Sequence, residues 1–247
     1  MEIGIDIGGS GIKGAVVDLD TGEFATERLR IPTPKKSTPE ACADTIAHIV
    51  EKLAPDGPEL RIGVTVPGPV VHGTVQMMAN LDRSWAGLAA ESFLSERLGR
   101  PITLINDADA AGLAEVYYGA AKGMKGVVVL TTLGTGIGSA IINNGQLLPN
   151  TEFGHIELDG HDAESRTSAG VREKEGLSYK EWAKRLDLYY QALERLLWPD
   201  LFVVGGGVSK NHEQFLPLLH LRTPIIPAAL RNRAGIVGAA WAAAQRG

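Results

Sequence analysis

The sequence has almost no cysteine and no long apolar stretch. Cys42 is the one cysteine among 247 residues, which excludes an internal disulfide framework and a cysteine-rich zinc site. No run approaches the ~20 apolar residues that a membrane-spanning helix needs, and Met1-Glu2 leads straight into Ile3 without the basic segment of a secretory leader. We therefore expect a cytoplasmic protein that does not enter a membrane.

An excess of positive charge is also lacking, since the formal net charge is −5. A general nucleic-acid binder is usually basic, so the charge argues against this class, although a local basic groove remains compatible with the total. Charged residues make up 21% and hydrophobic residues 44% of the chain, which is the balance of an ordinary globular protein. At this length we expect two small lobes rather than one compact domain.

The chain alternates between strand-like and helix-like segments, as an α/β protein does. Strands are predicted at residues 3–7, 12–18, 60–66, 102–105, 127–132, 137–142 and 201–204, and one more leads from the turn at residues 20–22 to near Ile31. Helices are predicted near residues 39–54, 88–98, 108–117, 177–197 and 234–245, the first of them starting at Thr38-Pro39. Asn144-Gly145 predicts a hairpin turn. Residues 11–17 are similar to residues 136–142, and each segment follows a strand and a glycine-rich turn. The repeat predicts two related halves, residues 1–107 and 108–247, with the final helix able to pack back on the first half.

Two glycine-rich turns follow predicted strands. The first, Asp6-x-Gly8-Gly9-Ser10-x-x-Lys13, places a carboxylate, two glycines without side chains and a lysine at the end of a strand. Glycine lets the chain approach a phosphate closely and Lys13 can neutralise its charge, although an ordinary hairpin has the same pattern. The Walker-type spacing G-x-x-x-x-G-K-[ST] is absent. The second turn, Gly134-Thr135-Gly136-x-Gly138, favours a phosphate site, because both turns can aim backbone N–H groups at an anion.

Polar side chains stand at other candidate positions. Asp107 closely follows the strand at residues 102–105, where an α/β fold usually places its ligand. There it could accept the proton of an attacking hydroxyl, or it could merely cap the next helix. Glu152 and His155 are three residues apart and could bind neighbouring hydroxyls of a ring, or they could be ordinary surface or buried groups. By default Asn80 is a turn residue.

The run Asp6-Ile7-Gly8-Gly9-Ser10-Gly11-Ile12-Lys13 resembles the first phosphate motif of the ROK family of sugar kinases and repressors. The resemblance continues in family order at Pro67-Gly68-Pro69, Asn80-Leu81, Asn106-Asp107-Ala108, Gly134-Thr135-Gly136-Ile137-Gly138, Glu152-x-Gly154-His155 and Gly205-Gly206-Gly207-Val208-Ser209. It implies an α/β protein with the two-lobed actin- and hexokinase-like (ribonuclease H-like) ATPase fold, whose lobes close over a sugar and a phosphoryl donor.

The same resemblance implies a role for each matching residue. Asp107 would be the catalytic base, and Asp6 would lie near a Mg²⁺ ion. Sugar hydroxyls would be held by Asn80, Asn106, Asp107, Glu152, His155 and Glu164. Phosphate would be bound by Asp6, Gly8, Gly9, Ser10, Lys13, Thr132, Gly134, Thr135, Gly136 and Gly138, and a nucleotide by Gly205, Gly206 and Gly207.

One departure from the family concerns its zinc loop. Most members carry a cysteine-rich loop after the histidine, and this chain has no cysteine beyond Cys42, so His155 should bind no zinc and its loop must be held otherwise. The glutamate that follows the loop in the family has two candidates here, Glu164 and Glu173. The zinc-free form around residues 131–155 is similar to polyphosphate glucokinases, which use inorganic polyphosphate and in some cases ATP as well.

The resemblance therefore implies a Mg²⁺-dependent kinase that makes glucose 6-phosphate from glucose and polyphosphate, as a homodimer. Alternatives are a strictly ATP-dependent glucokinase and a hexokinase of broader scope such as a glucomannokinase, because residues 205–209 resemble the family's nucleotide-binding turn. A sugar-responsive repressor or sensor of the same family is a further alternative. A repressor would need a DNA-binding helix-turn-helix before the first phosphate motif, where only Met1 and Glu2 stand, so we expect no nucleic-acid partner.

Overall fold

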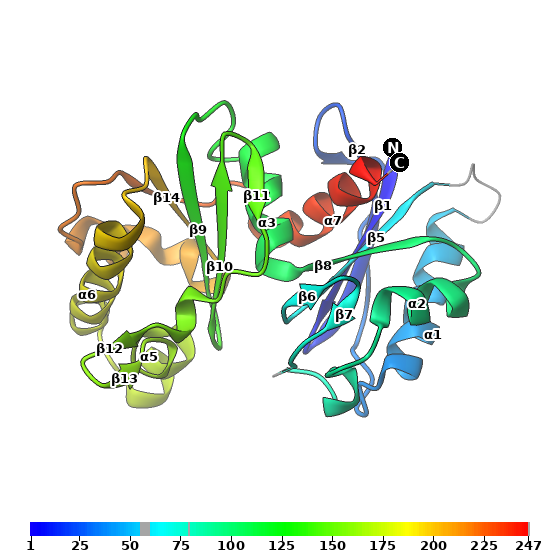
Figure 1. Cartoon of the computed structure of the whole chain (residues 1–247), viewed down its shortest axis with the longest axis horizontal. Helices are drawn as coiled ribbons and strands as arrows, with labels where there is room; N and C mark the ends of the chain where they lie inside the picture. Colours follow the sequence, from blue (N-terminus) through cyan, green and yellow to red (C-terminus); the bar gives the residue numbers. More distant parts are fainter. Residues whose placement is uncertain (55–59, 79, 247) are drawn as a thin grey trace. The chain divides into compact units, whose positions relative to one another are not determined.

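The computed structural model describes residues 1–54, 60–78 and 80–246, and the chain divides into two compact units (Figure 1). Unit 1 comprises Met1–Ala114 and Arg233–Gly247, and unit 2 comprises Glu115–Asn232. The division falls inside helix α3 (Asp107–Tyr117), beyond the boundary expected at Asp107, and the final helix belongs to unit 1. Within the described ranges no helix is long and apolar enough to cross a membrane.

The core of unit 1 is a mixed sheet with the strand order β3-β2-β1-β5-β8. Its strands are β1 (Glu2–Gly8), β2 (Gly11–Asp18), β3 (Glu23–Phe24), β4 (Leu29–Ile31), β5 (Ile62–Val66) and β8 (Ile102–Asn106), and β4 pairs with β2. β1 and β2 form an antiparallel hairpin, whereas β1, β5 and β8 run parallel. Because parallel strands point the same way, these three end at one edge of the sheet.

Three helices pack against this sheet, and the first part of α3 also belongs to unit 1. They are α1 (Pro39–Leu53), α2 (Ala90–Leu98) and α7 (Ala234–Gln245), and short elements β6 (Val70–Val71), β7 (Thr74–Val75) and η1 (Arg83–Trp85) join them in unit 1. α1 begins as the sequence predicts, with the Thr38 side chain accepting from the backbone N–H of Ala41 and Pro39 at the first helical position. Its Ile46 and Ile49 are fully buried, which fixes the helix on the sheet.

Helix α7 lies against β1 and β5 with backbone in contact with backbone (Figure 1). A Cβ atom on Gly4 would overlap the carbonyl of Ile236, and one on Gly63 would overlap the carbonyl of Ala239. The helix is rich in alanine, so small side chains on both partners permit this approach. Glycine is therefore required at both strand positions by the packing of the last helix.

The sequence predicts a single third strand reaching Ile31, and this prediction is wrong. The structure has two short strands instead, β3 and β4, separated by residues 25–28. The backbone N–H of Val16 donates to the Thr26 hydroxyl at 3.1 Å, where a continuous strand would offer a carbonyl. A side-chain hydroxyl thus replaces the backbone carbonyl that would pair with Val16 in a continuous strand, and the strand is interrupted there.

Unit 2 has its own mixed sheet, with the order β11-β10-β9-β14-β15. Its strands are β9 (Val127–Leu133), β10 (Ile137–Asn143), β11 (Gln146–Leu148), β14 (Leu201–Gly205) and β15 (Ile225–Pro227). Between β11 and β14 in the chain, β12 (Glu157–Leu158) and β13 (His161–Asp162) form a separate hairpin. The α-helices of unit 2 are α4 (Glu164–Thr167), α5 (Ala169–Glu175) and α6 (Tyr179–Leu197). Its short 3-10 helices are η2 (Phe153–His155), η3 (Gly207–Gln214), η4 (Leu216–Leu218) and η5 (Arg231–Arg233). Arg233, the last residue of η5, already belongs to unit 1.

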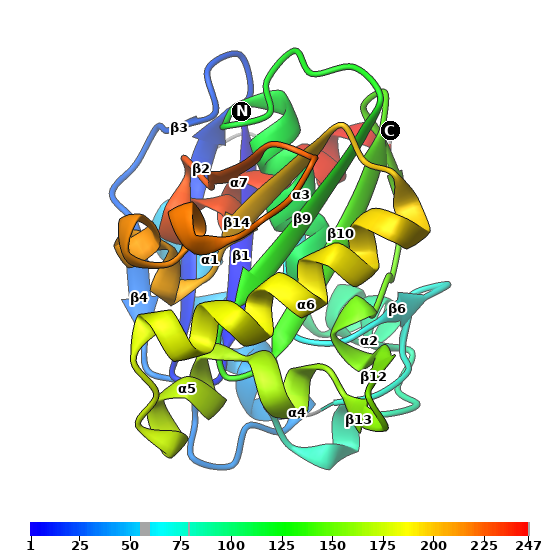
Figure 2. The ribbon, with the colours of Figure 1, turned by 90° about the vertical axis from the view of Figure 1, so that its left-hand side faces the viewer.

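Helix α6 runs across the sheet of unit 2 (Figure 2). A capping box begins it, since Ser178 and Glu181 bond to each other's backbone N–H groups. Tyr190 is fully buried and packs edge-on against Phe202 of β14, with the ring centroids 5.2 Å apart. The apolar face of the helix therefore closes the core of this unit.

The predicted repeat of strand, glycine turn and strand is confirmed. In each unit an antiparallel hairpin (β1–β2 or β9–β10) is followed across the sheet by two strands parallel to its first strand. The turn at Asn144-Gly145, expected from the sequence, is also present, with both residues at positive φ. The two units thus share one strand order, and equivalent turns stand at equivalent strand ends.

Candidate active site

In unit 1, Asp6 lies near the end of β1, opposite Lys13 of β2 and beside Thr65 of β5. The Lys13 ammonium is 2.9 Å from Asp6 Oδ2, and the Thr65 hydroxyl donates to Oδ1 at 3.1 Å. Both carboxylate oxygens are therefore held. The ion pair Asp6–Lys13 follows from the hairpin register, whereas Thr65 comes from a distant strand and sequence reasoning missed it.

The first glycine turn, residues 8–11, connects β1 to β2. Gly9 lies so close to residue 80 that a Cβ atom on it would be 3.3 Å from the Asn80 carbonyl oxygen. Arg30 of β4 crosses the other side of the turn, where its guanidinium donates to the Ser10 carbonyl at 2.9 Å. The structure therefore brings Asn80, the turn and Lys13 together, and it adds the Arg30 cation, which the sequence reasoning did not single out.

Asn106 and Asp107 stand at the end of β8, at the same sheet edge as Gly8. The buried Asn106 side chain accepts from the N–H groups of Ala108 at 2.8 Å and Asp109 at 3.0 Å, which is the bonding of a helix cap. Asp107 is the first residue of α3 and is half-buried. Asp107 Oδ1 also accepts from the Ala108 N–H at 2.8 Å, so both side chains bond to the first turn of α3, and the role of Asp107 as base or as cap stays a prediction.

In unit 2, the second glycine turn and the glycines after β14 lie side by side. Gly205 pairs with Thr132 of β9, and Gly206 has a φ of 82° with no room for a Cβ atom beside Leu133. The Ser209 hydroxyl donates to the Gly206 carbonyl at 2.8 Å. The glycines expected to bind phosphate and nucleotide are thus neighbours at the carboxyl ends of β9 and β14, which run parallel.

A carboxylate already touches the second turn. The backbone N–H of Ile137 donates to Glu164 Oε2 at 2.6 Å, and a Cβ atom on Gly136 would overlap the same carboxylate. Gly170 N–H donates to the Gly134 carbonyl at 2.9 Å and holds the other side of the turn. Glycine at position 136 is therefore needed so that Glu164 can reach the backbone.

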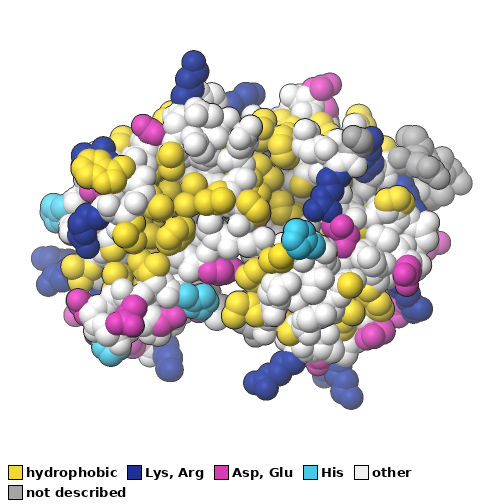
Figure 3. Space-filling view, in the orientation of Figure 1, with side chains coloured by type: hydrophobic (Ala, Val, Ile, Leu, Met, Phe, Trp, Pro, Cys, Tyr) yellow, Lys and Arg dark blue, Asp and Glu magenta, His cyan; other side chains and the backbone are white. Residues whose placement is uncertain are grey.

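Glu152, His155 and Glu164 form an electrostatically coupled group. Burial raises the pKa of Glu152 and the negative charge of Glu164 raises it further, while His155 opposes this. On the face shown in Figure 3, acidic and histidine side chains lie next to one another on the surface of unit 2. Of the two candidate glutamates, Glu164 belongs to this group, whereas Glu173 is exposed on α5.

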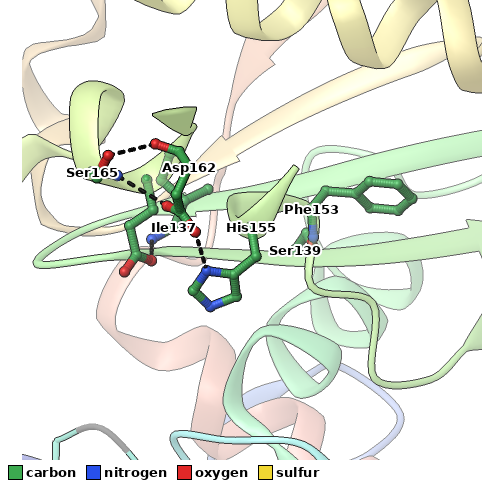
Figure 4. Close-up of polar contacts among 7 residues, drawn as sticks. Ile137, Ser139, Phe153, His155, Asp162 and Ser165 are labelled. Atoms are coloured by element: carbon green, nitrogen blue, oxygen red, sulfur yellow. Dashed lines mark hydrogen bonds and ion pairs between the residues drawn. The ribbon is translucent and has the colours of Figure 1, made fainter. Parts of the chain in front are cut away.

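His155 has a partner that the sequence reasoning missed. Its Nδ1 is 2.8 Å from Asp162 Oδ2 (Figure 4). The hydrogen bond to Asp162 is the largest influence on His155 and raises its pKa; burial works against this, and the charges of Glu164 and Glu152 add to the rise. Burial alone would raise the pKa of Asp162, but the bonds from His155 and Ser165 outweigh it and lower the pKa. The signal in the sequence was Asp159-Gly160, a hairpin turn that returns Asp162 toward His155.

The Asp6 carboxylate is a candidate ligand for a divalent cation that also binds a substrate phosphate. Among the residues that the structure describes, His, Cys, Asp and Glu form no group of three or more that could hold a metal. Mg²⁺ prefers one or two carboxylates together with substrate phosphates and water, and the Asp6 carboxylate beside the first glycine turn matches that requirement. The residues present therefore fit a Mg²⁺ ion that arrives with a phosphate chain.

Comparison with known proteins decides the family. The model of the ROK family matches residues 2–176, more than half of the chain. The chain belongs to the ROK family. Within it, a polyphosphate glucokinase of Mycobacterium tuberculosis is 53% identical over 240 residues, covering 97% of this chain and 89% of the relative.

Solved ROK structures agree with the fold. The inorganic polyphosphate/ATP-glucomannokinase from Arthrobacter sp. strain KM is 53% identical, with a TM-score of 0.94 and coverage of 100% of this chain and 99% of that one. A ROK glucokinase from Streptomyces griseus, solved with glucose and AMPPNP, is 26% identical, with a TM-score of 0.83 and 99% coverage of both chains. The predicted α/β fold of the actin- and hexokinase-like ATPases is confirmed, and so is the ROK resemblance.

Proposed function

We propose that this ROK chain is a polyphosphate-dependent glucokinase, which transfers the terminal phosphoryl group of inorganic polyphosphate to the 6-hydroxyl of glucose. The observation that carries the proposal is the 53% identity with a mycobacterial polyphosphate glucokinase across 97% of the chain. Asp107 after β8 and the two glycine turns at residues 8–10 and 134–138 also support the proposal. The products are glucose 6-phosphate and a polyphosphate shortened by one unit.

Asp107 is the catalytic base in this proposal. A sugar hydroxyl attacks phosphorus poorly until a base accepts its proton. The 6-oxygen forms a bond to the terminal phosphorus, the bond from that phosphorus to the next phosphate oxygen breaks, and the proton passes to the Asp107 carboxylate. In support, Asp107 directly follows β8, at the carboxyl ends of parallel strands, where an α/β fold usually binds its ligand.

The remaining polar groups orient the sugar. Asn80, Asn106, Glu152, His155 and Glu164 bind its hydroxyls, as the family resemblance implies. Carboxylates accept hydrogen bonds from hydroxyls, while amide and imidazole groups can donate as well as accept. Correct orientation of the attacking hydroxyl is a large part of phosphoryl-transfer catalysis.

The glycine turns bind the phosphate chain. Residues 8–10 with Lys13, and Thr132 with residues 134–138, provide the groups that bind phosphate, as the family resemblance implies. Mg²⁺, when bound near Asp6, neutralises negative charge on the phosphates and favours departure of the leaving phosphate. Lys13 adds a fixed positive charge, held on Asp6 at 2.9 Å.

ATP is a second candidate donor, and mannose a second candidate acceptor. The Arthrobacter relative is a polyphosphate/ATP-glucomannokinase at the same 53% identity. In this chain, residues 205–207 lie beside Thr132 and Leu133, so a nucleotide bound there would reach the second glycine turn. We propose that ATP is used less efficiently than polyphosphate.

The test is an assay of purified protein with Mg²⁺ and either polyphosphate or ATP, following glucose 6-phosphate. Parallel reactions with mannose define the acceptor range. We expect the larger kcat/KM with polyphosphate and glucose. Higher kcat/KM with ATP would make the chain an ATP-dependent glucokinase, and no product with either donor would refute the kinase proposal.

We also propose that the chain forms a homodimer through unit 2. Large apolar side chains are exposed there, on β11 and along and just after α6: Leu148, Leu188, Leu196 and Trp198. Light scattering after gel filtration should give twice the mass of the 26.2 kDa chain. Replacing Leu196 and Trp198 by polar residues should then yield monomers, and an unchanged dimer would place the interface elsewhere.

A further inference from the structure

We propose that Asp162 is a positioning residue, which holds the imidazole of His155 so that Nε2 is presented to a sugar hydroxyl. The inference rests on the proposed function, because it specifies how His155 performs its part in sugar binding. Figure 4 shows one ring nitrogen of His155 on Asp162 and the other directed away from it. Asp162 itself need not touch the sugar.

Both oxygens of the Asp162 carboxylate are engaged. Oδ2 is 2.8 Å from His155 Nδ1, and Oδ1 accepts from the Ser165 backbone N–H at 3.1 Å. The Ser165 hydroxyl donates to the Asp162 carbonyl at 2.6 Å. Ser165 therefore fixes the carboxylate and the backbone of the same residue, and the oxygen facing His155 has one orientation.

A tight hairpin brings Asp162 to His155. β12 pairs with β13 in the register Glu157 opposite Asp162. The turn residues Asp159 and Gly160 have φ values of 51° and 75°, the geometry of a two-residue hairpin. The chain thus leaves His155, turns back within a few residues and delivers the carboxylate to the ring.

The segment that carries the ring is fixed as well. Phe153 N–H donates to the Ser139 hydroxyl of β10 at 2.9 Å. A Cβ atom on Gly154 would overlap the Ile137 carbonyl, so the backbone of η2 lies directly on β10. His155 is therefore anchored through its backbone on the sheet and through its ring on the hairpin.

This arrangement determines what Nε2 can do. An ionised carboxylate only accepts hydrogen bonds, so Nδ1 carries the hydrogen; in the neutral ring Nε2 is then an acceptor, and in the protonated ring it is a donor. The charged groups facing the ring are Asp162 from β13, Glu164 from α4 and Glu152 before η2. All are acidic, so they favour the protonated ring and a donor at Nε2.

Asp162→Asn tests the proposal, with Asp159→Asn as its matched control. Both substitutions remove one negative charge from the same hairpin, but Asp159 is exposed and sits in the turn, where asparagine is well tolerated. We expect KM for glucose to rise about five-fold in Asp162→Asn, the size of one bond between half-exposed charged groups. KM for polyphosphate should stay unchanged, and Asp159→Asn should match the wild type.

A second readout needs no catalysis. Nitrogen-15 spectra of the histidine rings, assigned by the loss of one signal set in His155→Gln, should show Nδ1 protonated in the neutral wild-type ring. In Asp162→Asn this preference should weaken, and the titration midpoint of His155 should fall because one facing carboxylate is gone. Asp162→Glu, which restores a carboxylate on a longer arm, should recover part of both effects.

Unchanged glucose KM and unchanged His155 spectra in a folded Asp162→Asn variant would overturn the positioning role. If Asp162→Asn does not fold, the same comparison is made with Asp162→Ser, which also lacks the carboxylate, and wild-type values in both readouts would overturn it. Wild-type protein that makes no glucose 6-phosphate would refute the proposed function instead. In that case the ring spectra still decide whether Asp162 sets the tautomer.

Discussion

At the scale of single residues, Asn106 and Asp107 both bond to the first turn of α3, and we propose Asp107 as the base. The Asn106 side-chain oxygen accepts from the N–H groups of Ala108 and Asp109, and Asp107 Oδ1 accepts from that of Ala108. Replacing Asp107 by Asn keeps the shape of the side chain and removes its ability to accept a proton. We expect kcat to fall at least ~10²-fold, the low end for a positioned base, while KM for glucose changes far less.

Steady-state kinetics on Asp107→Asn, with polyphosphate and glucose varied separately, measure both constants. Asp44→Asn is the control, because Asp44 lies on α1 and pairs with Arg97 at the surface. Its kinetics should match those of the wild type. Turnover close to normal in Asp107→Asn would remove Asp107 from the role of base.

The His155–Asp162 pair should make stability depend on pH. The pKa of His155 is raised above its ordinary 6.5, so its contribution is complete below pH 6.5 and is lost as the pH rises through the raised value. The pKa of Asp162 is lowered below 3.8, so its contribution is complete above pH 3.8 and is lost as the pH falls through the lowered value. The pair therefore stabilises the fold most between these limits.

Urea unfolding of the wild type and of Asp162→Asn at several pH values checks this dependence. The difference in the free energy of unfolding should be largest between about pH 4 and 6.5 and should shrink toward pH 8. The side chains of His155 and Asp162 are 46% and 43% exposed, so the largest difference in the free energy of unfolding should stay below ~1 kcal/mol. A difference that grows with rising pH would have the wrong sign for this pair.

The sequence could predict residues whose motifs are local, and it missed partners that folding brings in. Lys13 stands opposite Asp6 within one hairpin, so short-range spacing was enough to pair them. Thr65 reaches Asp6 from another strand, and no spacing in the sequence reveals that contact. Likewise, no spacing in the sequence reveals that Glu164, and not Glu173, approaches the Gly136 backbone and accepts from the Ile137 N–H.

At the scale of elements, the contact of α7 with β1 and β5 is the most demanding packing in unit 1. Gly63→Ala places a methyl group against the Ala239 carbonyl, which belongs to backbone and cannot rotate away. Overpacking of this kind costs about 1–3 kcal/mol or more. The melting temperature should therefore fall by several degrees, as measured by calorimetry.

Gly99→Ala provides the comparison within the same unit. Gly99 ends α2 with a φ of 63°, and no heavy atom lies within 4 Å of where its Cβ would be. Only the strain of the left-handed conformation remains, about 1 kcal/mol. Equal destabilisation by the two substitutions would contradict the backbone contact between α7 and β5.

Strong local patterns predicted most elements, and tertiary contacts decided the exceptions. Thr38-Pro39 marked the start of α1, and Asn144-Gly145 marked the turn between β10 and β11. The break between β3 and β4 was not predicted, because it depends on the Thr26 hydroxyl replacing a carbonyl opposite Val16. A threonine in a strand-like run gives no warning of this exchange, since threonine is also common in strands.

At the scale of the whole molecule, charge should distinguish the two phosphoryl donors. The net charge is −5, so a polyanion must be attracted by local cations such as Lys13 and Arg30 beside the first glycine turn. Long-range attraction is screened by salt, with a Debye length of about 10 Å at 0.1 M. We expect kcat/KM for polyphosphate to fall more steeply with salt than kcat/KM for ATP.

Rates with both donors, measured from low to high ionic strength at constant Mg²⁺, test this expectation. Arg30→Gln should reduce the salt dependence for polyphosphate, because one cation near the turn is removed. Arg97→Gln, which removes a surface charge paired with Asp44, is the matched control. Equal salt slopes for polyphosphate and ATP would argue against an electrostatic groove.

Metal content is a second property of the whole chain. We expect no tightly held zinc, because Cys42 is the one cysteine, and a dependence on Mg²⁺ for activity. Elemental analysis of purified protein should find less than stoichiometric zinc, and EDTA should stop the reaction until Mg²⁺ alone is restored. One zinc per chain, or recovery only with added zinc, would contradict this expectation.

The return of α7 to unit 1 has a consequence for synthesis on the ribosome. Residues 115–232 emerge as one continuous stretch and can fold while the chain is still growing, but β1 and β5 lack their covering helix until the last residues appear. At ~5–20 residues per second, that delay lasts roughly ten to forty seconds after β5 is made. The first strand to be translated is thus among the last to be buried, and a nascent chain stalled before residue 234 would expose it to chaperones and proteases.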